Sequence, residues 1–198
     1  MGKQANGYIR QITPRDRELL FQLAKTGMAS TEQSEKYCDV KLTRLKRLER
    51  SKYIKLTTLT NGGKETTIIQ LDKQGRQYVK NDMLYSEKLA VANPEHVNHD
   101  LQLTETYYHL PLEYQRSFKC ENELIRKIYQ EKPELLNKLP TCLDATIEVN
   151  GETIGIEVIG KTYTQGVINS KIEIARNHLN CSKIQWINNT GKTYNFNN

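Results

Sequence analysis

The first 83 residues carry hydrophobic positions at helical spacing, then two β-rich segments and a further helical pattern. A first helix is predicted to begin at Thr13–Asp16. Threonine suits its N-cap, proline its first turn, and aspartate the positive end of the helix dipole. Its apolar stripe consists of Leu19, Leu20, Leu23 and Ala24. The sequence Ser30–Gln33 fits a capping box and predicts a second, short helix.

A third helix is predicted over Asp39–Arg50, with the Asp39 side chain at its N-cap. Leucine recurs every three residues at positions 42, 45 and 48, so one face of this helix is apolar. Five cations occupy its other sides against one acid, Glu49: Lys41, Arg44, Lys46, Arg47 and Arg50. The pattern suits a helix that docks on its own domain and meets DNA phosphates and base edges with its cations. The alternative is a solvated, charged helix face.

Two strands and a tight turn follow the third helix. Tyr53–Leu59 and Glu65–Leu71 are rich in β-branched residues, and Asn61–Lys64 between them is a turn signal. Asp72 suits the cap of a fourth helix that extends to about Met83. This order predicts a winged helix-turn-helix over residues 1–83, with its third helix in the major groove and Lys64 at the hairpin tip against phosphate. A winged helix used only for protein contacts is the alternative.

The remainder predicts a small α/β domain with a central mixed sheet over residues 99–190. A connecting segment at 84–98 precedes it, and a polar tail at 191–198, expected to be poorly ordered, follows it. The predicted elements are helices at 99–108, 121–129 and 165–179 and strands at 114–118, 143–149, 152–159 and 183–187. The whole chain is therefore expected to be an α+β or α/β protein.

Two carboxylates are brought together by the hairpin predicted at Asn150–Gly151. If this turn closes the hairpin, direct pairing places Asp144 opposite Glu157, on one face at one end of the sheet. Carboxylates so placed are suited to share a divalent cation. The neighbours expected to take part are Lys161 or Lys171, which would steady a phosphate anion, and Glu121 or Glu123, which would add an oxygen ligand.

This arrangement is similar to the core of the PD-(D/E)xK nucleases. The nuclease pattern has a lysine two residues after the glutamate, where this chain has Ile159, and its proline–aspartate pair is replaced by Leu143–Asp144. In one interpretation Lys161 is a migrated catalytic lysine; in another the nuclease fold is inactive. A third interpretation is a hairpin that carries acids at its exposed ends.

Composition and charge narrow the class of protein. The 198 residues, 37% hydrophobic and 26% charged, suit one large or two small soluble domains. A net charge of +6 favours a polyanionic partner. Four scattered cysteines, Cys38, Cys120, Cys142 and Cys181, form no metal-ligand pair and indicate a reduced, cytoplasmic protein. No apolar run approaches the roughly 20 residues of a membrane span, and the N-terminus lacks a signal-peptide core.

Short segments spread along nearly the whole chain are similar to those of one protein family. In order, they are Thr13–Glu18, Arg44–Arg50, His99–Leu101, Glu121–Arg126, Asp144 and Ile156–Val158. In these segments the chain resembles the replication-relaxation family of bacterial mobile elements. The resemblance implies a winged helix joined to a nuclease-like α/β domain, and work on plasmid, phage or conjugative-element DNA. The departures at Ile159 and Leu143 argue against nuclease activity.

The first functional hypothesis is a sequence-specific double-stranded DNA-binding protein of a mobile element, with an inactive nuclease-like domain. It would act as a transcriptional regulator or as a replication or relaxosome accessory factor. We expect a homodimer in the bacterial cytoplasm, associated with nucleoid or plasmid. Its further expected partners are other replication or transfer proteins, and no membrane association is expected. The residues expected to contact DNA are Lys41, Thr43, Arg44, Lys46, Arg47, Arg50 and Lys64.

The second hypothesis is a metal-dependent endonuclease guided by the winged helix. Asp144 and Glu157 would then hold Mg²⁺ and act with Lys161 in catalysis, with Glu121 and Lys171 in secondary roles. Without that activity no cofactor is expected. The third hypothesis is a module whose second domain binds a protein or peptide.

Overall fold

The computed structural model describes residues 7–61, 64–139, 141–160, 163–188 and 193–194. The chain is a mixed α+β protein that divides into two compact units, an N-terminal unit (Met1–Ser86) and a C-terminal unit (Glu87–Asn198). The segment predicted as a connection, 84–98, contains a short 3₁₀ helix and the first residues of a longer helix. Among the described residues, no helix has the length and apolar character needed to cross a bilayer.

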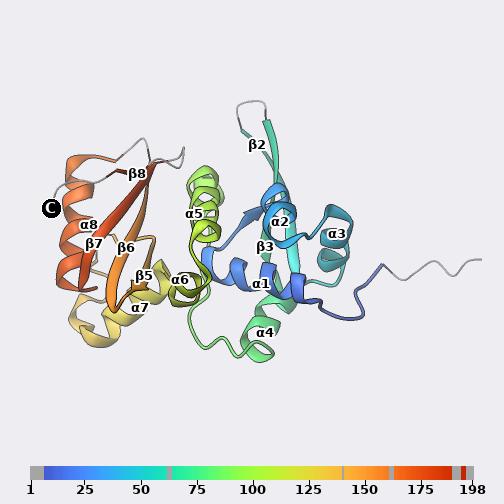
Figure 1. The fold of residues 1–198 in the computed structure, drawn as a ribbon, viewed down its shortest axis with the longest axis horizontal. Coiled ribbons are helices and arrows are strands. Elements are labelled where there is room, and N and C mark those ends of the chain that lie inside the picture. The colour runs from blue at the N-terminus through green and yellow to red at the C-terminus, as the bar shows by residue number, and fades with distance from the viewer. Residues whose placement is uncertain (1–6, 62–63, 140, 161–162, 189–192, 195–198) are drawn as a thin grey trace, which may run out of the picture. The chain divides into compact units, whose positions relative to one another are not determined.

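The described residues of the N-terminal unit form four helices and a three-stranded antiparallel sheet with the order β1-β3-β2 (Figure 1). Its helices are α1 (Pro14–Thr26), α2 (Thr31–Cys38), α3 (Leu42–Arg50) and α4 (Lys73–Asn81). Its strands are β1 (Ala29–Ser30), β2 (Ile54–Asn61) and β3 (Lys64–Leu71). The fully buried side chains that join these elements are Leu19, Leu20 and Leu23 of α1, Leu45 and Leu48 of α3, and Ile54 and Ile69 of the sheet.

Local capping signals fix the first two helices where the sequence predicts them. Thr13 and Asp16 form a reciprocal capping box at the start of α1, and Ser30 and Gln33 form one at the start of α2. In each box a side-chain oxygen accepts a backbone N–H that the helix itself leaves without a partner. Both predicted caps are therefore confirmed.

The predicted cap of the third helix is wrong. Asp39 ends α2 in a left-handed conformation, with φ of 51°, and its N–H donates to the carbonyl oxygen of Glu35. Aspartate tolerates this region of backbone space better than most residues, so it can terminate a helix there. The α3 helix begins at Leu42 instead, with Lys41 at its N-cap and no side-chain capping bond. The Asp39 carboxylate is paired with Arg15 at 2.6 Å.

The C-terminal unit is built on a five-stranded mixed sheet with the order β4-β5-β6-β7-β8, in which only β6 and β7 run parallel among the described strands. The strands are β4 (Lys119–Cys120), β5 (Ala145–Val149), β6 (Glu152–Ile159), β7 (Cys181–Asn188) and β8 (Thr193–Tyr194). The helices are α5 (Val97–His109), α6 (Leu112–Ser117), α7 (Glu121–Glu131), α8 (Gln165–Asn177) and two 3₁₀ turns, η1 (Pro94–His96) and η2 (Pro133–Leu135).

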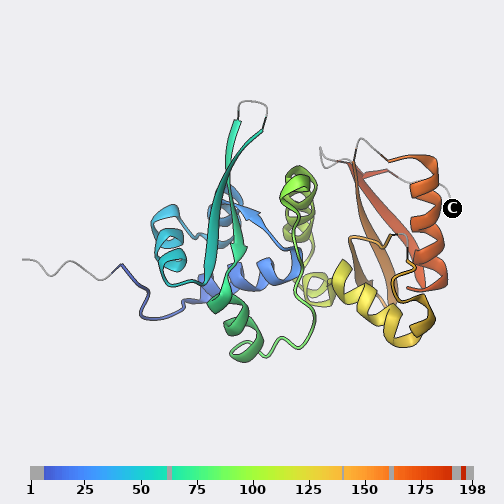
Figure 2. The same ribbon diagram turned by 180° about the vertical axis from the view of Figure 1, so that it is seen from behind.

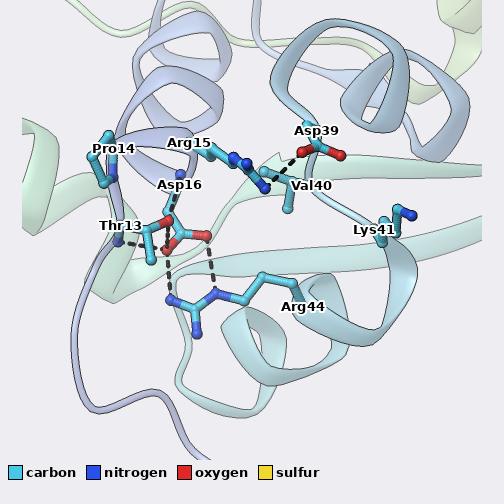
Figure 3. A pocket seen from close by; sticks show the side chains of 8 residues that line it. All are labelled: Thr13, Pro14, Arg15, Asp16, Asp39, Val40, Lys41 and Arg44. Carbon is cyan, nitrogen blue, oxygen red and sulfur yellow. Dashed lines mark hydrogen bonds and ion pairs between the residues drawn. The ribbon is translucent and has the colours of Figure 1, made fainter.

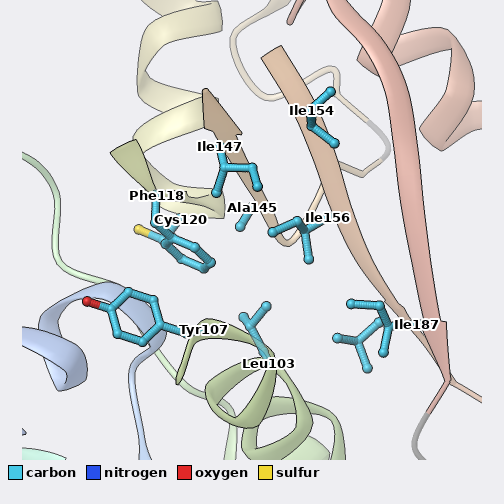
Figure 4. Close-up of a cluster of buried hydrophobic side chains, with 10 residues drawn as sticks. Leu103, Tyr107, Phe118, Cys120, Ala145, Ile147, Ile154, Ile156 and Ile187 are labelled. Atoms are coloured by element: carbon cyan, nitrogen blue, oxygen red, sulfur yellow. The ribbon is translucent and has the colours of Figure 1, made fainter. Parts of the chain in front are cut away.

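Alternate residues of β6 enter two separate cores on the two faces of this sheet, as the period of a strand requires. Ile154, Ile156 and Val158 pack with Leu103 and Tyr107 of α5 (Figure 4). The opposite face packs against α7 and α8 around the fully buried Trp186. Figures 1 and 2 show α5 on one side of the sheet and α8 on the other.

One predicted strand of the C-terminal unit is wrong, and the predicted tail is described only at residues 193–194. The strand predicted at 114–118 is the helix α6, because the chain turns after Pro111, whose carbonyl oxygen accepts the N–H groups of Tyr114 and Gln115. The tail predicted at 191–198 includes a strand, β8, in which Tyr194 pairs with Trp186 of β7. A polar composition does not exclude pairing when a neighbouring strand offers an open edge.

Candidate nucleic-acid interface and buried acid–lysine cluster

The outer surface of α3 is cationic. Leu45 and Leu48 are fully buried and anchor the helix in the N-terminal unit, so the residues between them face outward. The exposed residues at or next to α3 include five that the sequence predicts as DNA contacts: Lys41, Thr43, Lys46, Arg47 and Arg50. Within the described part of the chain, no hydrogen bond or ion pair engages the side chains of Lys46 and Arg47.

The single acid of α3 does not offset this charge on the outer surface. Glu49 is half-buried, and its Oε1 accepts the backbone N–H of Leu56 in β2 at 3.1 Å. This bond directs the carboxylate toward the sheet. The outward-facing surface of α3 therefore presents Lys46 and Arg47 without a neighbouring acid from the same helix.

Arg44, which the sequence predicts to lie in a DNA groove, has a partner within the N-terminal unit. Its Nε lies 3.0 Å and its Nη2 2.5 Å from the two carboxylate oxygens of Asp16, whose exposed fraction is 0% (Figure 3). Nη2 also donates to the carbonyl oxygen of Gln11 at 2.8 Å. Arg44 therefore joins α3 to the start of α1, while its contact with DNA stays a prediction. Its partner Asp16 lies 28 residues away, so helix periodicity does not show this ion pair.

The pKa of Asp16 is lowered by this environment. Burial alone would raise it, but the hydrogen bonds from Arg44 and from the backbone and hydroxyl of Thr13 stabilise the carboxylate more strongly. Asp16 and Arg44 line one side of an open pocket of about 550 Å³, and the Arg15–Asp39 pair and Lys41 line the other (Figure 3). The pocket thus lies at the N-terminal end of α3.

The side chains of two predicted cations fall outside the described structure. Lys64 is placed only by its backbone, at the start of β3 and opposite Asn61 of β2, as a residue beside the hairpin tip should be. Lys161 lies outside the described residues.

In the C-terminal unit, Asp144 and Glu157 lie together as the hairpin register requires. Ala145 pairs with Ile156, so the next pair outward would be Asp144 and Glu157. The backbone N–H of Asp144 donates to Glu157 Oε2 at 3.2 Å, and Asp144 Oδ2 accepts the N–H of Val158 at 2.7 Å. The predicted juxtaposition is present, at the end where β5 begins and β6 approaches its end.

Lys171 of α8 is the lysine that the structure brings to this acid pair. Its Nζ lies 2.5 Å from Glu157 Oε1 and 2.6 Å from the carbonyl oxygen of Cys142. The Tyr163 hydroxyl also donates to Glu157 Oε1, at 2.5 Å. Burial and the nearby Asp144 charge raise the pKa of Glu157, while Lys171 and Tyr163 act in the opposite direction.

His99 and Asp100 complete the cluster, although the sequence did not predict them as part of it. His99 Nε2 lies 3.1 Å from Asp144 Oδ2, and its Nδ1 lies 3.0 Å from Asp100 Oδ1. Burial alone would lower the pKa of His99, but the hydrogen bonds with the two carboxylates raise it to about 10. The adjacent His99–Asp100 pair near a helix start was the available signal, but only the fold shows that His99 contacts Asp144, 45 residues later.

Glu121 lies at the edge of the same cluster. Its backbone N–H donates to the Asp144 carbonyl oxygen at 2.9 Å, which fixes the first residue of α7 beside β5. Burial and the Asp144 charge raise the pKa of its carboxyl group. Glu123, the other predicted acid of α7, is buried.

As it is arranged, the cluster offers a divalent cation few carboxylate oxygens that lack a protein donor. Magnesium needs several oxygen ligands around one position. Protein donors occupy both oxygens of Glu157, and Asp144 Oδ2 accepts from Val158 and His99. Within the described ranges, no three His, Cys, Asp or Glu side chains are placed to hold one metal ion. The arrangement instead neutralises buried acids with a lysine and a histidine.

Comparisons of this chain with protein-family models, with curated proteins and with solved structures find no match.

Proposed function

We propose that this protein binds double-stranded DNA through the exposed cationic face of α3. The observation that carries the proposal is that Leu45 and Leu48 anchor the helix while Lys46 and Arg47 face outward without an intramolecular partner among the described residues. A helix so mounted can enter the major groove, with its cations on phosphates and base edges. The ion pair between Arg44 and the buried Asp16 supports the proposal, since it ties α3 to the start of α1.

The order of elements in the N-terminal unit supports a winged helix-turn-helix as the DNA-reading module. Three helices precede a long hairpin of β2 and β3, and β1 pairs with β3 to complete the sheet. In that arrangement the hairpin beside α3 would contact a flanking phosphate through Lys64. We further propose a homodimer bound to two half-sites, acting as a regulator or as a replication or transfer accessory factor of a mobile element, as the resemblance to the replication-relaxation family implies.

Replacing Lys46 and Arg47 with Ala together is expected to weaken duplex binding at least tenfold. The slope of log Kd against log salt concentration should fall by about two, because each lost phosphate contact removes about one unit. Binding is measured by fluorescence anisotropy, on a duplex selected from a random pool by the wild-type protein. The control variant, Arg116→Ala with Lys183→Ala, removes the same charge from exposed positions of the C-terminal unit.

Equal losses in the two double variants would show that net charge, rather than α3, supplies the affinity, and would contradict the assignment. No duplex affinity even at low salt would remove the DNA-binding proposal and leave a protein- or peptide-binding role.

We propose that the C-terminal unit is a nuclease-like scaffold that does not cleave DNA. The supporting observation is that Lys171 and Tyr163 already bind the Glu157 carboxylate, while His99 and Val158 bind Asp144. A catalytic metal would have to displace these donors from a residue whose exposed fraction is 0%, Glu157. One observation favours the alternative, a metal-dependent endonuclease. Lys171 lies next to the acid pair, where the nuclease pattern needs a lysine.

Supercoiled plasmid incubated with the protein and either Mg²⁺ or Mn²⁺ is expected to remain intact, because the acid pair is neutralised by protein donors rather than open to a metal. The measurement is the conversion of supercoiled to nicked or linear plasmid on an agarose gel. Cleavage that is abolished by Asp144→Ala, but kept in Glu134→Ala, would establish the endonuclease instead. Cleavage that persists in both variants would indicate a contaminating nuclease.

A further inference from the structure

Leu42, the first residue of α3, is the one leucine of this helix that the described structure leaves exposed. Its exposed fraction is 47%, whereas Leu45 and Leu48 are fully buried. Thr43 and Lys46 beside it are exposed as well. Leu42 therefore places an aliphatic group among the polar and cationic side chains on the outer surface of α3.

Helix geometry places Leu42 between the cationic face and the buried stripe. Successive residues turn by about 100°, so Leu42 lies about 40° from Lys46 on one side and about 60° from Leu45 on the other. Glu49, two turns later on the same side, is bound to the Leu56 N–H. No acid of α3 therefore competes for the surface that Leu42 and Lys46 share.

The major groove offers one apolar group along its base edges, the C5-methyl of thymine. Residues at the N-terminal end of a recognition helix contact base edges. An exposed leucine at this position would bury its own methyl groups against a thymine methyl, whereas guanine and cytosine carry no methyl group there. We infer that Leu42 reads a thymine in the major groove, an inference that rests on the DNA-binding function proposed for α3.

Replacement of single thymines by deoxyuridine tests the contact, because deoxyuridine differs from thymidine only by the absent methyl group. Each thymine of the duplex selected by the wild-type protein is replaced in turn, and Kd is measured by anisotropy. The affinity of the wild-type protein is expected to fall about fourfold when one particular thymine is replaced, because the complex then buries one methyl group fewer. Leu42→Ala should lower affinity for the thymine duplex and lose the sensitivity to deoxyuridine at that position.

The matched control is Leu112→Ala, which removes a leucine with an exposed fraction of 72% from the C-terminal unit and should keep the full wild-type sensitivity. Tight binding with no response to any thymine replacement would overturn the inference and leave the proposed function standing. A Leu42→Ala variant that keeps the response, with circular dichroism equal to wild type, would overturn the inference in the same way. Absence of duplex binding by the wild-type protein would overturn both.

Discussion

Replacing Arg44 with Ala is expected to lower the free energy of unfolding of the N-terminal unit by about 2–4 kcal/mol. The substitution leaves the Asp16 carboxylate, whose exposed fraction is 0%, with only its bonds to Thr13. A buried charge without its partner is costly, although the 25% exposed fraction of the Arg44 side chain reduces the effect below that of a fully buried pair. The matched control is Arg47→Ala, an exposed arginine of the same helix, for which a change within about 0.5 kcal/mol is expected.

Native-state amide hydrogen exchange at Leu45 and Leu48 measures this effect in the full chain. Exchange is the suitable readout because the single tryptophan, Trp186, lies in the C-terminal unit and does not report on α3. Equal protection in the Arg44→Ala and Arg47→Ala variants would contradict the structural role assigned to the Asp16–Arg44 pair.

The Asp16–Arg44 pair predicts that the N-terminal unit loses stability at low pH. The pKa of Asp16 is lowered below its ordinary value of 3.8, so the folded state favours the ionised carboxylate. Its contribution to stability is therefore complete above about pH 4 and is lost as the pH falls through the lowered pKa. Asp16→Asn should be less stable than wild type at pH 7 and should lose part of this acid dependence.

Features that depend on neighbouring residues were predictable from the sequence, whereas those that depend on tertiary contacts were not. The capping boxes of α1 and α2 rest on residues three apart, and the β5–β6 register follows from the turn at Asn150–Gly151 by counting. Asp39 shows the limit of local reasoning, because the same residue can cap the start of one helix or end the preceding one. Only the backbone conformation distinguishes the two.

In the candidate sites, too, contacts between neighbouring strands were predictable, whereas contacts from packed helices were not. Counting along the hairpin brought Asp144 and Glu157 together, but two lysines were equally compatible with the sequence, and the fold places Lys171 of α8 there. His99 reaches Asp144 from α5, an element on the other face of the sheet from α8. Neither contact follows from a repeat or a motif, since each depends on how helices pack on the sheet.

Replacing Lys171 with Met is expected to destabilise the C-terminal unit by up to about 3–5 kcal/mol at pH 8, because Glu157 loses its cation and must take up a proton or stay charged without a partner. The side chain of Lys171 is 7% exposed, so water cannot replace the lost interaction. Unfolding in urea followed by Trp186 fluorescence measures the change, since Trp186 is buried in the core that α8 covers. The matched control is Lys183→Met, an exposed lysine of β7, which should change stability by no more than about 0.5 kcal/mol.

The cost of Lys171→Met should depend on pH in a defined direction. Burial and the Asp144 charge raise the pKa of Glu157 from 4.5 to about 8, so proton uptake contributes stability at low pH that is lost as the pH rises toward 8. Removing the Lys171 ammonium raises this pKa further. Because this pKa is raised, Glu157 takes up a proton in the folded state as the pH falls, so the variant should be closer to wild type at pH 5 than at pH 8.

Adding Glu157→Gln to Lys171→Met removes the buried charge together with its lost partner and should restore much of the stability. The double variant should also lose the part of the pH dependence that Glu157 contributes, since glutamine does not titrate. If Lys171→Met is no less stable than Lys183→Met at pH 8, Lys171 is not the cation that neutralises the acid pair. A double variant that is no more stable than Lys171→Met would contradict the explanation by an uncompensated Glu157 charge and would attribute the loss to packing of the α8 helix instead.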